Sequence, residues 1–288
     1  MVDAVAAGGG VVVDPPDAVG LVWTDPTDAL GLATVLRDSP GVRWVQLPFA
    51  GVDAFVGVLD TSRAWTSAKG IYSEPVAEHA LALGLAGLRC LPARARAHEW
   101  GRPAGSRLMG QRVTILGGGG ITVALLKLLA PFGVEATVVR RHPSPVEGAA
   151  RVVGPERLAD ALPGACLVVL ALALTPDTRG VIGARELALM DGEAWLVNVA
   201  RGPHVDTDAL VVALARGEIG GAALDVTDPE PLPAGHPLWD LDNCLITPHT
   251  ANTWAMAEPL LAQRVRENVA RLGRGEPLVG HVDLDLGY

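Results

Sequence analysis

The segment RVTILGGGGIT, residues 112–122, joins a short apolar run to four consecutive glycines, after which an apolar helical pattern begins. The run VTIL predicts a buried strand, and ITVALLKLL predicts the helix that follows the turn. Gly117 and Gly119 occupy the first two positions of the G-x-G-x-x-G pattern, in which one glycine makes a tight turn and the next lets a pyrophosphate approach the backbone. The segment therefore predicts a dinucleotide-binding turn.

Thr122 stands at the third position of this pattern, where a glycine normally allows close packing of helix and strand. We expect its Cβ and hydroxyl to push the helix and strand slightly apart, unless the hydroxyl bonds a backbone group in the first turn. An ordinary glycine-rich β-α turn remains the alternative reading of the motif when it is taken alone.

Apolar runs and helical patterns alternate over residues 112–248, which is typical of a β-α-β series. The runs are apolar throughout, so we predict strands that are covered on both faces, as in a parallel sheet with helices on each side. The predicted strands are VTIL, ATVV, CLVVLALAL, WLVNVA, GAALDV and CLITP.

A weaker alternation precedes this series, with GLVWT, WVQLP and TSAKGI as candidate strands and a long helix over residues 75–91. Residues 91–110 lose the apolar periodicity and concentrate Arg, Gly and Pro, which indicates a connection between domains. The last helical pattern is expected to cross back to the first domain. We therefore predict a first domain over residues 1–97, completed by 266–288, and a second over 98–265.

Composition excludes several classes of function. The net charge of −9 and the lack of a dense Lys/Arg run argue against binding to nucleic acid. The apolar stretch at residues 166–174 is about half the ~20 residues of a membrane-spanning helix. No secretory signal is visible, and three widely spaced cysteines suit free thiols in a reducing compartment, so a cytoplasmic protein is expected.

The second predicted strand of the series ends in Val139-Arg140-Arg141, where an acidic residue normally accepts hydrogen bonds from a ribose 2′-hydroxyl. Glu135 precedes that strand and lies at the wrong end to do this. Because two guanidinium groups suit a 2′-phosphate, we favour NADP over NAD. The alternative is that the arginines are solvated and that NAD binds without a charged partner at its ribose.

Three polar residues follow later strands of the same predicted sheet: Arg201 after WLVNVA, Glu230 after GAALDV and His249 after CLITP. Reduction of a 2-oxo acid requires a positive group at the carboxylate and carbonyl oxygen, together with a proton donor. Arg201 is predicted to supply the first and His249 the second, with Glu230 orienting the imidazole and stabilising its protonated form. Taken singly, Arg201 could be a surface charge, Glu230 a loop acid and His249 a hydrogen-bonded polar residue without a catalytic role. Their recurrence at successive strand ends favours catalytic roles.

The chain resembles the D-isomer-specific 2-hydroxyacid dehydrogenase family over nearly its whole length. The resemblance implies an α/β protein of two Rossmann-like domains with parallel sheets, namely a discontinuous substrate domain and an NAD(P)-binding domain, assembled as a homodimer. It also implies that Arg201, Glu230 and His249 are catalytic. The matching segments are YSEPVAEHALAL, RVTILGGGGI, LTPDTRGVIG, VNVARGPHVDTDAL, GAALDVTDPEPLPAGHPLW, LITPHTAN and ENVARLGRGEPLVGHVDLDLGY.

The same resemblance implies further contacts. The backbone amides of Ala50 and Gly51 would receive the substrate carboxylate, together with Arg201 and His249. Asp225 would face the nicotinamide carboxamide. The expected cofactor-binding residues are Gly117, Gly119, Gly120, Ile121, Arg140, Arg141, Leu172, Val199, Ala200 and Asp225.

The remaining histidines are not predicted to be catalytic residues or metal ligands. His79, within a helical run, is interpreted as a core or interface residue, and no histidine pair has the i, i+4 spacing of a helical metal site, so no metal is expected. Two other functions stay open: a nucleotide-sensing protein of the same fold without turnover, and a related oxidation of phosphite or formate. Formate enzymes of this resemblance carry Gln at the place of Glu230, which disfavours formate but leaves phosphite open.

Overall fold

The computed structural model describes residues 1–284. The chain divides into two compact units, of which unit 1 comprises Met1–Tyr72 with Thr253–Tyr288 and unit 2 comprises Ser73–Asn252. The predicted C-terminal completion of the first domain extends to residue 288, so its last four residues lie outside the described residues.

Unit 2 contains a seven-stranded parallel sheet in the order β10-β9-β8-β7-β4-β5-β6. From β4 the chain first builds outward to β6 and then returns to β7 on the other side of β4. The topological switch point therefore lies between β4 and β7, and ligands of such sheets bind there at the carboxyl ends of the strands. The strands are β4 (Arg112–Leu116), β5 (Glu135–Val139), β6 (Arg151–Val153), β7 (Ala165–Leu170), β8 (Trp195–Asn198), β9 (Gly221–Leu224) and β10 (Cys244–Ile246).

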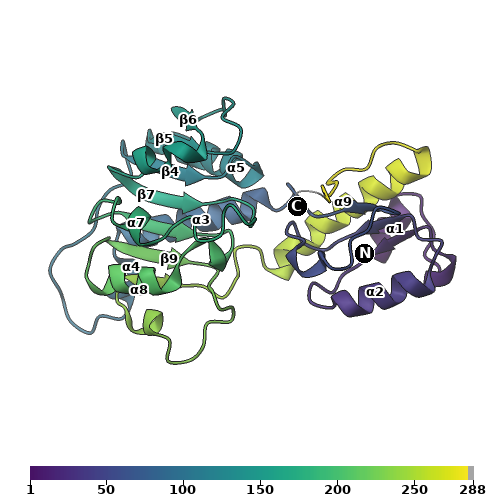
Figure 1. The fold of residues 1–288 in the computed structure, drawn as a ribbon, viewed down its shortest axis with the longest axis horizontal. Coiled ribbons are helices and arrows are strands. Elements are labelled where there is room, and N and C mark those ends of the chain that lie inside the picture. Colours follow the sequence, from purple (N-terminus) through teal and green to yellow (C-terminus); the bar gives the residue numbers. More distant parts are fainter. Residues whose placement is uncertain (285–288) are drawn as a thin grey trace. The chain divides into compact units, whose positions relative to one another are not determined.

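Both faces of this sheet are covered, as the continuous apolar runs predict (Figure 1). In β7, Leu167 and Val169 pack against α3 (Ser73–Leu88) and α5 (Gly120–Leu129), whereas Val168 and Leu170 face the opposite core. That core is closed by α6 (Leu158–Ala161), α7 (Ala184–Leu187) and α8 (Thr207–Ala215). All six predicted strands of this unit are confirmed, while the short edge strand β6 was missed because three residues carry too little periodicity.

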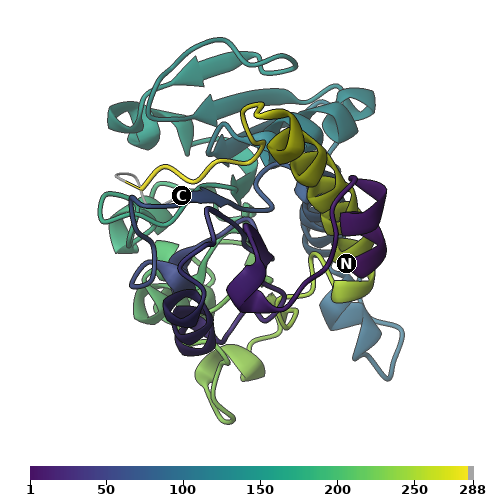
Figure 2. The same cartoon turned by 90° about the vertical axis from the view of Figure 1, so that its right-hand side faces the viewer.

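Unit 1 is built on a three-stranded parallel sheet of β1 (Gly20–Val22), β2 (Trp44–Gln46) and β3 (Ala64–Thr66). Leu32 and Leu36 of α2 (Ala29–Asp38) pack in one core with Val45 and Trp65 of the sheet. A second core joins α1 (Val2–Ala7) to α9 (Trp254–Arg274), which lie side by side in Figure 2. The C-terminal helix thus packs within unit 1, as its sequence pattern predicts.

The third strand of unit 1 begins before TSAKGI, so that prediction is wrong in its placement. Trp65 and Thr66 pair with β2, whereas the amides of Ser67 and Ala68 bond to the carbonyls of Gly280 and Phe49 and leave the ladder. Residues 67–71 consequently form a loop.

The structure also divides the chain earlier than the predicted boundaries after residues 97 and 265. Helix α3 buries Ala77, Ala80 and Leu83 in the core of the large sheet, which places it in unit 2. The helix ends at Leu88, because Cys90 adopts a left-handed φ of 53° before the short α4 (Leu91–Ala95). At the other boundary, α9 packs into unit 1 from its first turns onward.

No helix among residues 1–284 combines the length and the apolar composition needed to cross a membrane.

Candidate active site

The glycine turn between β4 and α5 lies at the switch point of the large sheet. Gly117 has a φ of +111°, and a Cβ built on it would lie 2.1 Å from the carbonyl oxygen of Ala171, which follows β7. A Cβ built on Gly119 would lie in open space, with none of the atoms considered within 4 Å. One glycine therefore allows two strand ends to approach each other, and the other leaves its backbone accessible to a ligand.

Thr122 is fully buried in the first turn of α5, and its hydroxyl donates to the carbonyl oxygen of Gly117 at 3.0 Å. This confirms the second of the two expectations for Thr122: the hydroxyl bonds a backbone group. The departure from a third glycine is thereby accommodated within the turn itself.

The two glycines predict a matched pair of variants. Gly117→Ala is expected to lower the free energy of unfolding of unit 2 by roughly 3 kcal/mol or more, because it combines a φ that L-residues avoid with a backbone collision. Gly119→Ala is expected to cost less than about 1 kcal/mol, the difference between the two residues at a helix N-cap. Thermal and urea denaturation followed by circular dichroism measures both. Equal destabilisation by the two variants would contradict the distinct roles of the two glycines.

Positive charge lies beside this turn. Arg140 directly follows β5, and its side chain lies against Gly118, where an added Cβ would be 2.7 Å from its Cδ and Nε atoms. Arg141 is next in the chain and is exposed. Gly120 and Ile121 form the first turn of α5, where backbone amides have no intrahelical acceptor and favour an anion. The turn and the free amides fit a dinucleotide, and the two guanidinium groups add positive charge beside it.

The other expected cofactor-binding residues follow β7 and β8 at the same edge of the sheet. Leu172 lies beside the turn, since its amide nitrogen is 3.0 Å from where a Cβ on Gly117 would be. Its carbonyl oxygen lies 3.2 Å from Nε2 of the buried His204. Val199 and Ala200 come directly after β8 and are buried.

Arg201 is positioned by the last residue of β8. The side chain of Asn198 donates to the carbonyl oxygen of Arg201 at 2.9 Å and accepts from the amide of Ala200 at 3.0 Å. The Arg201 guanidinium donates to the carbonyl oxygen of Ala200 at 2.7 Å. A single amide side chain therefore shapes the turn that carries the arginine.

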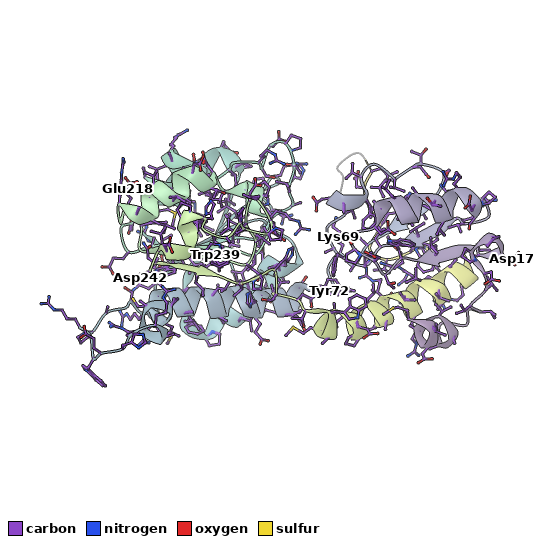
Figure 3. All side chains as sticks on the ribbon, turned by 90° about the horizontal axis from the view of Figure 1, so that it is seen from below. Asp17, Lys69, Tyr72, Glu218, Trp239 and Asp242 are labelled. Atoms are coloured by element: carbon purple, nitrogen blue, oxygen red, sulfur yellow. The ribbon has the colours of Figure 1, made fainter. Side chains whose placement is uncertain are left out.

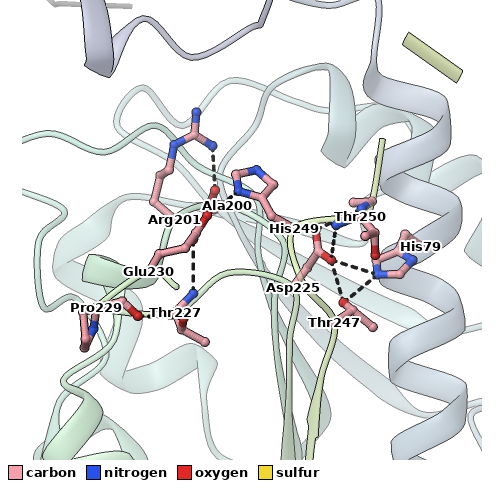
Figure 4. A network of polar contacts seen from close by, with 11 residues as sticks. His79, Ala200, Arg201, Asp225, Thr227, Pro229, Glu230, Thr247, His249 and Thr250 are labelled. Atoms are coloured by element: carbon pink, nitrogen blue, oxygen red, sulfur yellow. Dashed lines mark hydrogen bonds and ion pairs between the residues drawn. The ribbon is translucent and has the colours of Figure 1, made fainter. Parts of the chain in front are cut away.

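Glu230 and His249 are in direct contact (Figure 4). The imidazole Nδ1 lies 2.7 Å from the Glu230 carboxylate, and the other carboxylate oxygen accepts from the amide of Thr227 at 3.4 Å. An ionised carboxylate only accepts, so Nδ1 carries a proton and Nε2 is the ring atom left for a substrate. Both side chains are about half exposed, at 51% for His249 and 41% for Glu230.

The backbone around His249 is held in an uncommon conformation by Asp225. His249 has a φ of 52°, which is rare for a residue other than glycine. Its amide donates to the carbonyl oxygen of Asp225 at 2.8 Å, while the amides of Thr250 and Ala251 donate to the carboxylate of the same residue at 2.8 and 3.0 Å. Three consecutive amides thus bind one residue at the end of β9. These bonds fix the backbone position from which the His249 side chain extends.

The Asp225 carboxylate has two further partners. Thr247 donates to it at 2.6 Å, and Nε2 of His79 lies 3.3 Å from the same oxygen. Burial by itself raises the pKa of this carboxyl, but the hydrogen bonds from His79, Thr247 and the two amides outweigh burial and lower the pKa to about 2. The charged form therefore stabilises the fold above pH ~4, and this contribution is lost as the pH falls from ~4 towards 2.

His79 is the residue whose importance the sequence analysis missed. Its Nε2 lies 3.1 Å from the Thr247 hydroxyl, whose own proton goes to Asp225, so Nε2 donates. Figure 4 shows His79, Thr247 and Asp225 on one side of His249, and Glu230 with Arg201 on the other side. No local signal marks the histidine, because α3 meets the ends of β9 and β10 only in the folded chain.

Ala50 and Gly51, the expected carboxylate-binding residues, lie in unit 1, in the loop that follows β2. In the part of the chain that the structure describes, no hydrogen bond uses the amide of either residue. Two adjacent amides are therefore free to bind an anion.

The sequence of this chain is similar to those of known proteins. The family model for the NAD binding domain of D-isomer specific 2-hydroxyacid dehydrogenases matches residues 80–251. An uncharacterized protein of Corynebacterium melassecola is 41% identical over 260 residues, which are 87% of this chain and 86% of that protein. Glyoxylate/hydroxypyruvate reductase A of Serratia proteamaculans is 35% identical over 177 residues, which cover 61% of this chain and 56% of the reductase.

The fold has a solved counterpart. The crystal structure of a D-isomer specific 2-hydroxyacid dehydrogenase from Xanthobacter autotrophicus Py2, in complex with NADPH and MES, matches with a TM-score of 0.83 and 36% identity. The match covers 98% of this chain and 89% of that one.

Proposed function

Because the chain belongs to the D-isomer-specific 2-hydroxyacid dehydrogenase family, a family of NAD(P)-dependent oxidoreductases, we propose that it reduces a small 2-oxo acid with NADPH. We assign Arg201, Glu230 and His249 as its catalytic residues. The observation that carries the proposal is the hydrogen bond between Glu230 and His249 at the sheet edge that also holds the glycine turn.

Each residue has a distinct task in this reaction. When bound, NADPH supplies a hydride to C2 of the substrate. The Nε2–H of His249 gives a proton to the carbonyl oxygen, which becomes the hydroxyl group of the product. Glu230 holds Nδ1 of the ring and stabilises the protonated imidazole, and the Arg201 guanidinium binds the carboxylate and polarises the carbonyl oxygen.

The free amides of Ala50 and Gly51 support a role in holding the substrate carboxylate. Neutral N–H donors in an irregular loop bind anions without introducing a second buried charge.

The direct test is a panel of 2-oxo acids followed by the absorbance of NADPH. Glyoxylate and hydroxypyruvate are the first candidates, because they are the substrates named for the Serratia proteamaculans relative. Branched and aromatic 2-oxo acids extend the panel to larger side chains. Binding of NADPH without turnover of any 2-oxo acid would refute the proposed activity.

For the cofactor, we expect the protein to use NADPH at a lower KM than NADH. Arg141→Ser is expected to raise the KM for NADPH about tenfold and to leave that for NADH within about twofold, since only the 2′-phosphate loses a charge-assisted hydrogen bond. Steady-state kinetics with each cofactor at saturating substrate makes the comparison.

Arg151→Ser is the matched control, because Arg151 is an exposed arginine in the edge strand β6 of the same unit. It is expected to leave both KM values unchanged. A lower KM for NADH than for NADPH in the unmodified protein would refute the preference, as would equal effects of the two arginine substitutions.

The alternatives fit the site less well. A sensor protein without turnover has no need of the Glu230–His249 contact, and the oxidation of formate proceeds without a proton relay. The similarity to a named 2-oxo acid reductase also favours a 2-hydroxyacid substrate over phosphite.

We also propose a cytoplasmic homodimer that binds neither nucleic acid nor membrane. The connection between α3 and β4 supports a second copy as partner, because it exposes Leu91, Met109 and the whole side chain of Trp100. The net charge of −9 disfavours nucleic acid.

A further inference from the structure

The loop at residues 48–52 of unit 1 is anchored at both ends. The hydroxyl of Tyr72 donates to the carbonyl oxygen of Pro48 at 2.8 Å, and the amide of Ala68 donates to that of Phe49 at 3.0 Å. At the other end, Val52 is 1% exposed and packs in the core beneath α2. Between these anchors, Ala50 and Gly51 make no hydrogen bond to any of the described residues, so their amides are free.

Tyr72 itself is rigidly placed. Its side chain is 6% exposed, and its ring meets that of Phe49 edge to face, with the centroids 6.4 Å apart and the planes at 70°. Burial raises the pKa of the phenol well above its usual range, so the hydroxyl remains a hydrogen-bond donor at any ordinary pH.

The segment that carries Tyr72 is in turn held by α9. The buried guanidinium of Arg264 donates to the carbonyl oxygens of Ser67 and Lys69, at 3.0 and 3.3 Å. Ala68, the donor to Phe49, lies between these two residues in the chain. Lys69 and Tyr72 are labelled in Figure 3. The anchors of the 48–52 loop therefore rest on the C-terminal helix, far along the sequence.

We propose that Tyr72 is a positioning residue for substrate binding: its hydroxyl fixes the loop so that the amides of Ala50 and Gly51 stay directed at the substrate carboxylate. The inference rests on the proposed function, because a 2-oxo acid carboxylate is the ligand. Tyr72 acts through the loop and contacts no reacting atom. Without its hydroxyl, the loop samples more conformations and the two amides are no longer preorganised.

The test is Tyr72→Phe, which keeps the ring and removes only the hydroxyl. The KM for the 2-oxo acid is expected to rise about five- to tenfold, the effect of one lost buried hydrogen bond. The kcat is expected to stay within about twofold, because the carboxylate is bound alike in the ground and transition states. NADPH affinity, measured by fluorescence titration, is expected to be unchanged.

Trp65→Phe is the matched control. It also removes an aromatic donor to a backbone carbonyl in unit 1, since Nε1 of Trp65 donates to the carbonyl oxygen of Asp60 at 2.9 Å, a bond in which residues 48–52 take no part. Trp65 shares the core of Val52, so a change of KM that came from weakened packing alone would also occur in this variant. Circular dichroism melts show whether the two variants lose similar stability. The control is expected to lower Tm while leaving the KM for the 2-oxo acid unchanged.

Two results would overturn the inference alone: a KM within twofold of the unmodified enzyme in Tyr72→Phe, or the same rise of KM in both variants. An unmodified protein that binds NADPH but turns over no 2-oxo acid would overturn the proposed function and this inference with it. A selective rise of KM in Tyr72→Phe supports the positioning role.

Discussion

Replacement of His249 by alanine is expected to lower kcat for the 2-oxo acid by about 10³-fold, the typical contribution of a positioned general acid. The ring is oriented by Glu230 at 2.7 Å, which leaves Nε2 to deliver the proton. Alanine removes the donor but retains the backbone, so NADPH affinity is expected to change less than about twofold. Single-turnover measurements of NADPH oxidation separate this chemical step from product release.

His98→Ala is the control for this experiment. His98 lies exposed in the connection between α3 and β4 of the same unit, and its loss is expected to leave kcat unchanged. A His249→Ala enzyme that kept more than a tenth of the normal kcat would show that another group protonates the carbonyl oxygen.

Replacement of Arg201 by alanine is expected to lower kcat/KM for the 2-oxo acid by about 10³-fold, and to lower kcat as well as raise KM. The guanidinium serves two purposes in the proposed mechanism, since it binds the carboxylate and stabilises the negative charge that develops on the carbonyl oxygen. Arg201→Lys is expected to recover only part of the loss, because an ammonium group keeps the charge without the planar fork of donors.

Arg216→Ala provides the comparison, since Arg216 is a largely exposed arginine that caps the end of α8 in the same unit. It is expected to leave both kinetic constants unchanged. If Arg201→Ala changed KM alone, the residue would bind the substrate without assisting the chemical step, and the mechanism would need a different group at the carbonyl oxygen.

The backbone of the His249 loop explains how a solvent-accessible imidazole is placed accurately. A φ of 52° at a non-glycine residue costs free energy and persists only where its surroundings determine it. Asp225 meets that condition by binding the amides of three consecutive residues. The expectation that Asp225 faces the nicotinamide remains a proposal, but most of its hydrogen-bonding capacity is directed at this loop.

Local sequence patterns are sufficient for the architecture of unit 2. Continuous apolar runs require strands buried on both faces, and glycines that follow the first run require a turn with a close backbone approach. Parallel strands then bring their carboxyl ends to one edge, so Arg201, Glu230 and His249 are expected near one another even though they are far apart in the sequence. The contact between Glu230 and His249 follows from this topology.

The same patterns are insufficient to assign a helix to one of two domains when either sheet could be covered by it. The sequence of an apolar helix such as α3 does not indicate which sheet it covers. Only in the folded chain do Ala77, Ala80 and Leu83 pack into the core of the large sheet. The predicted domain boundary therefore lay after the helix, whereas the structure divides the chain before it.

The amino-acid sequence by itself determined the β-α series, the glycine turn and the three polar residues at the strand ends, because each depends on periodicity or spacing within a short segment. The family followed from the resemblance of longer segments to known sequences. Only the tertiary structure decided that His79 bonds to Asp225 and Thr247, and that Tyr72 holds the loop of Ala50 and Gly51. These contacts join segments through hydrogen bonds of about 3 Å, and such short-range directional interactions leave no trace in the order of residues until the chain is packed.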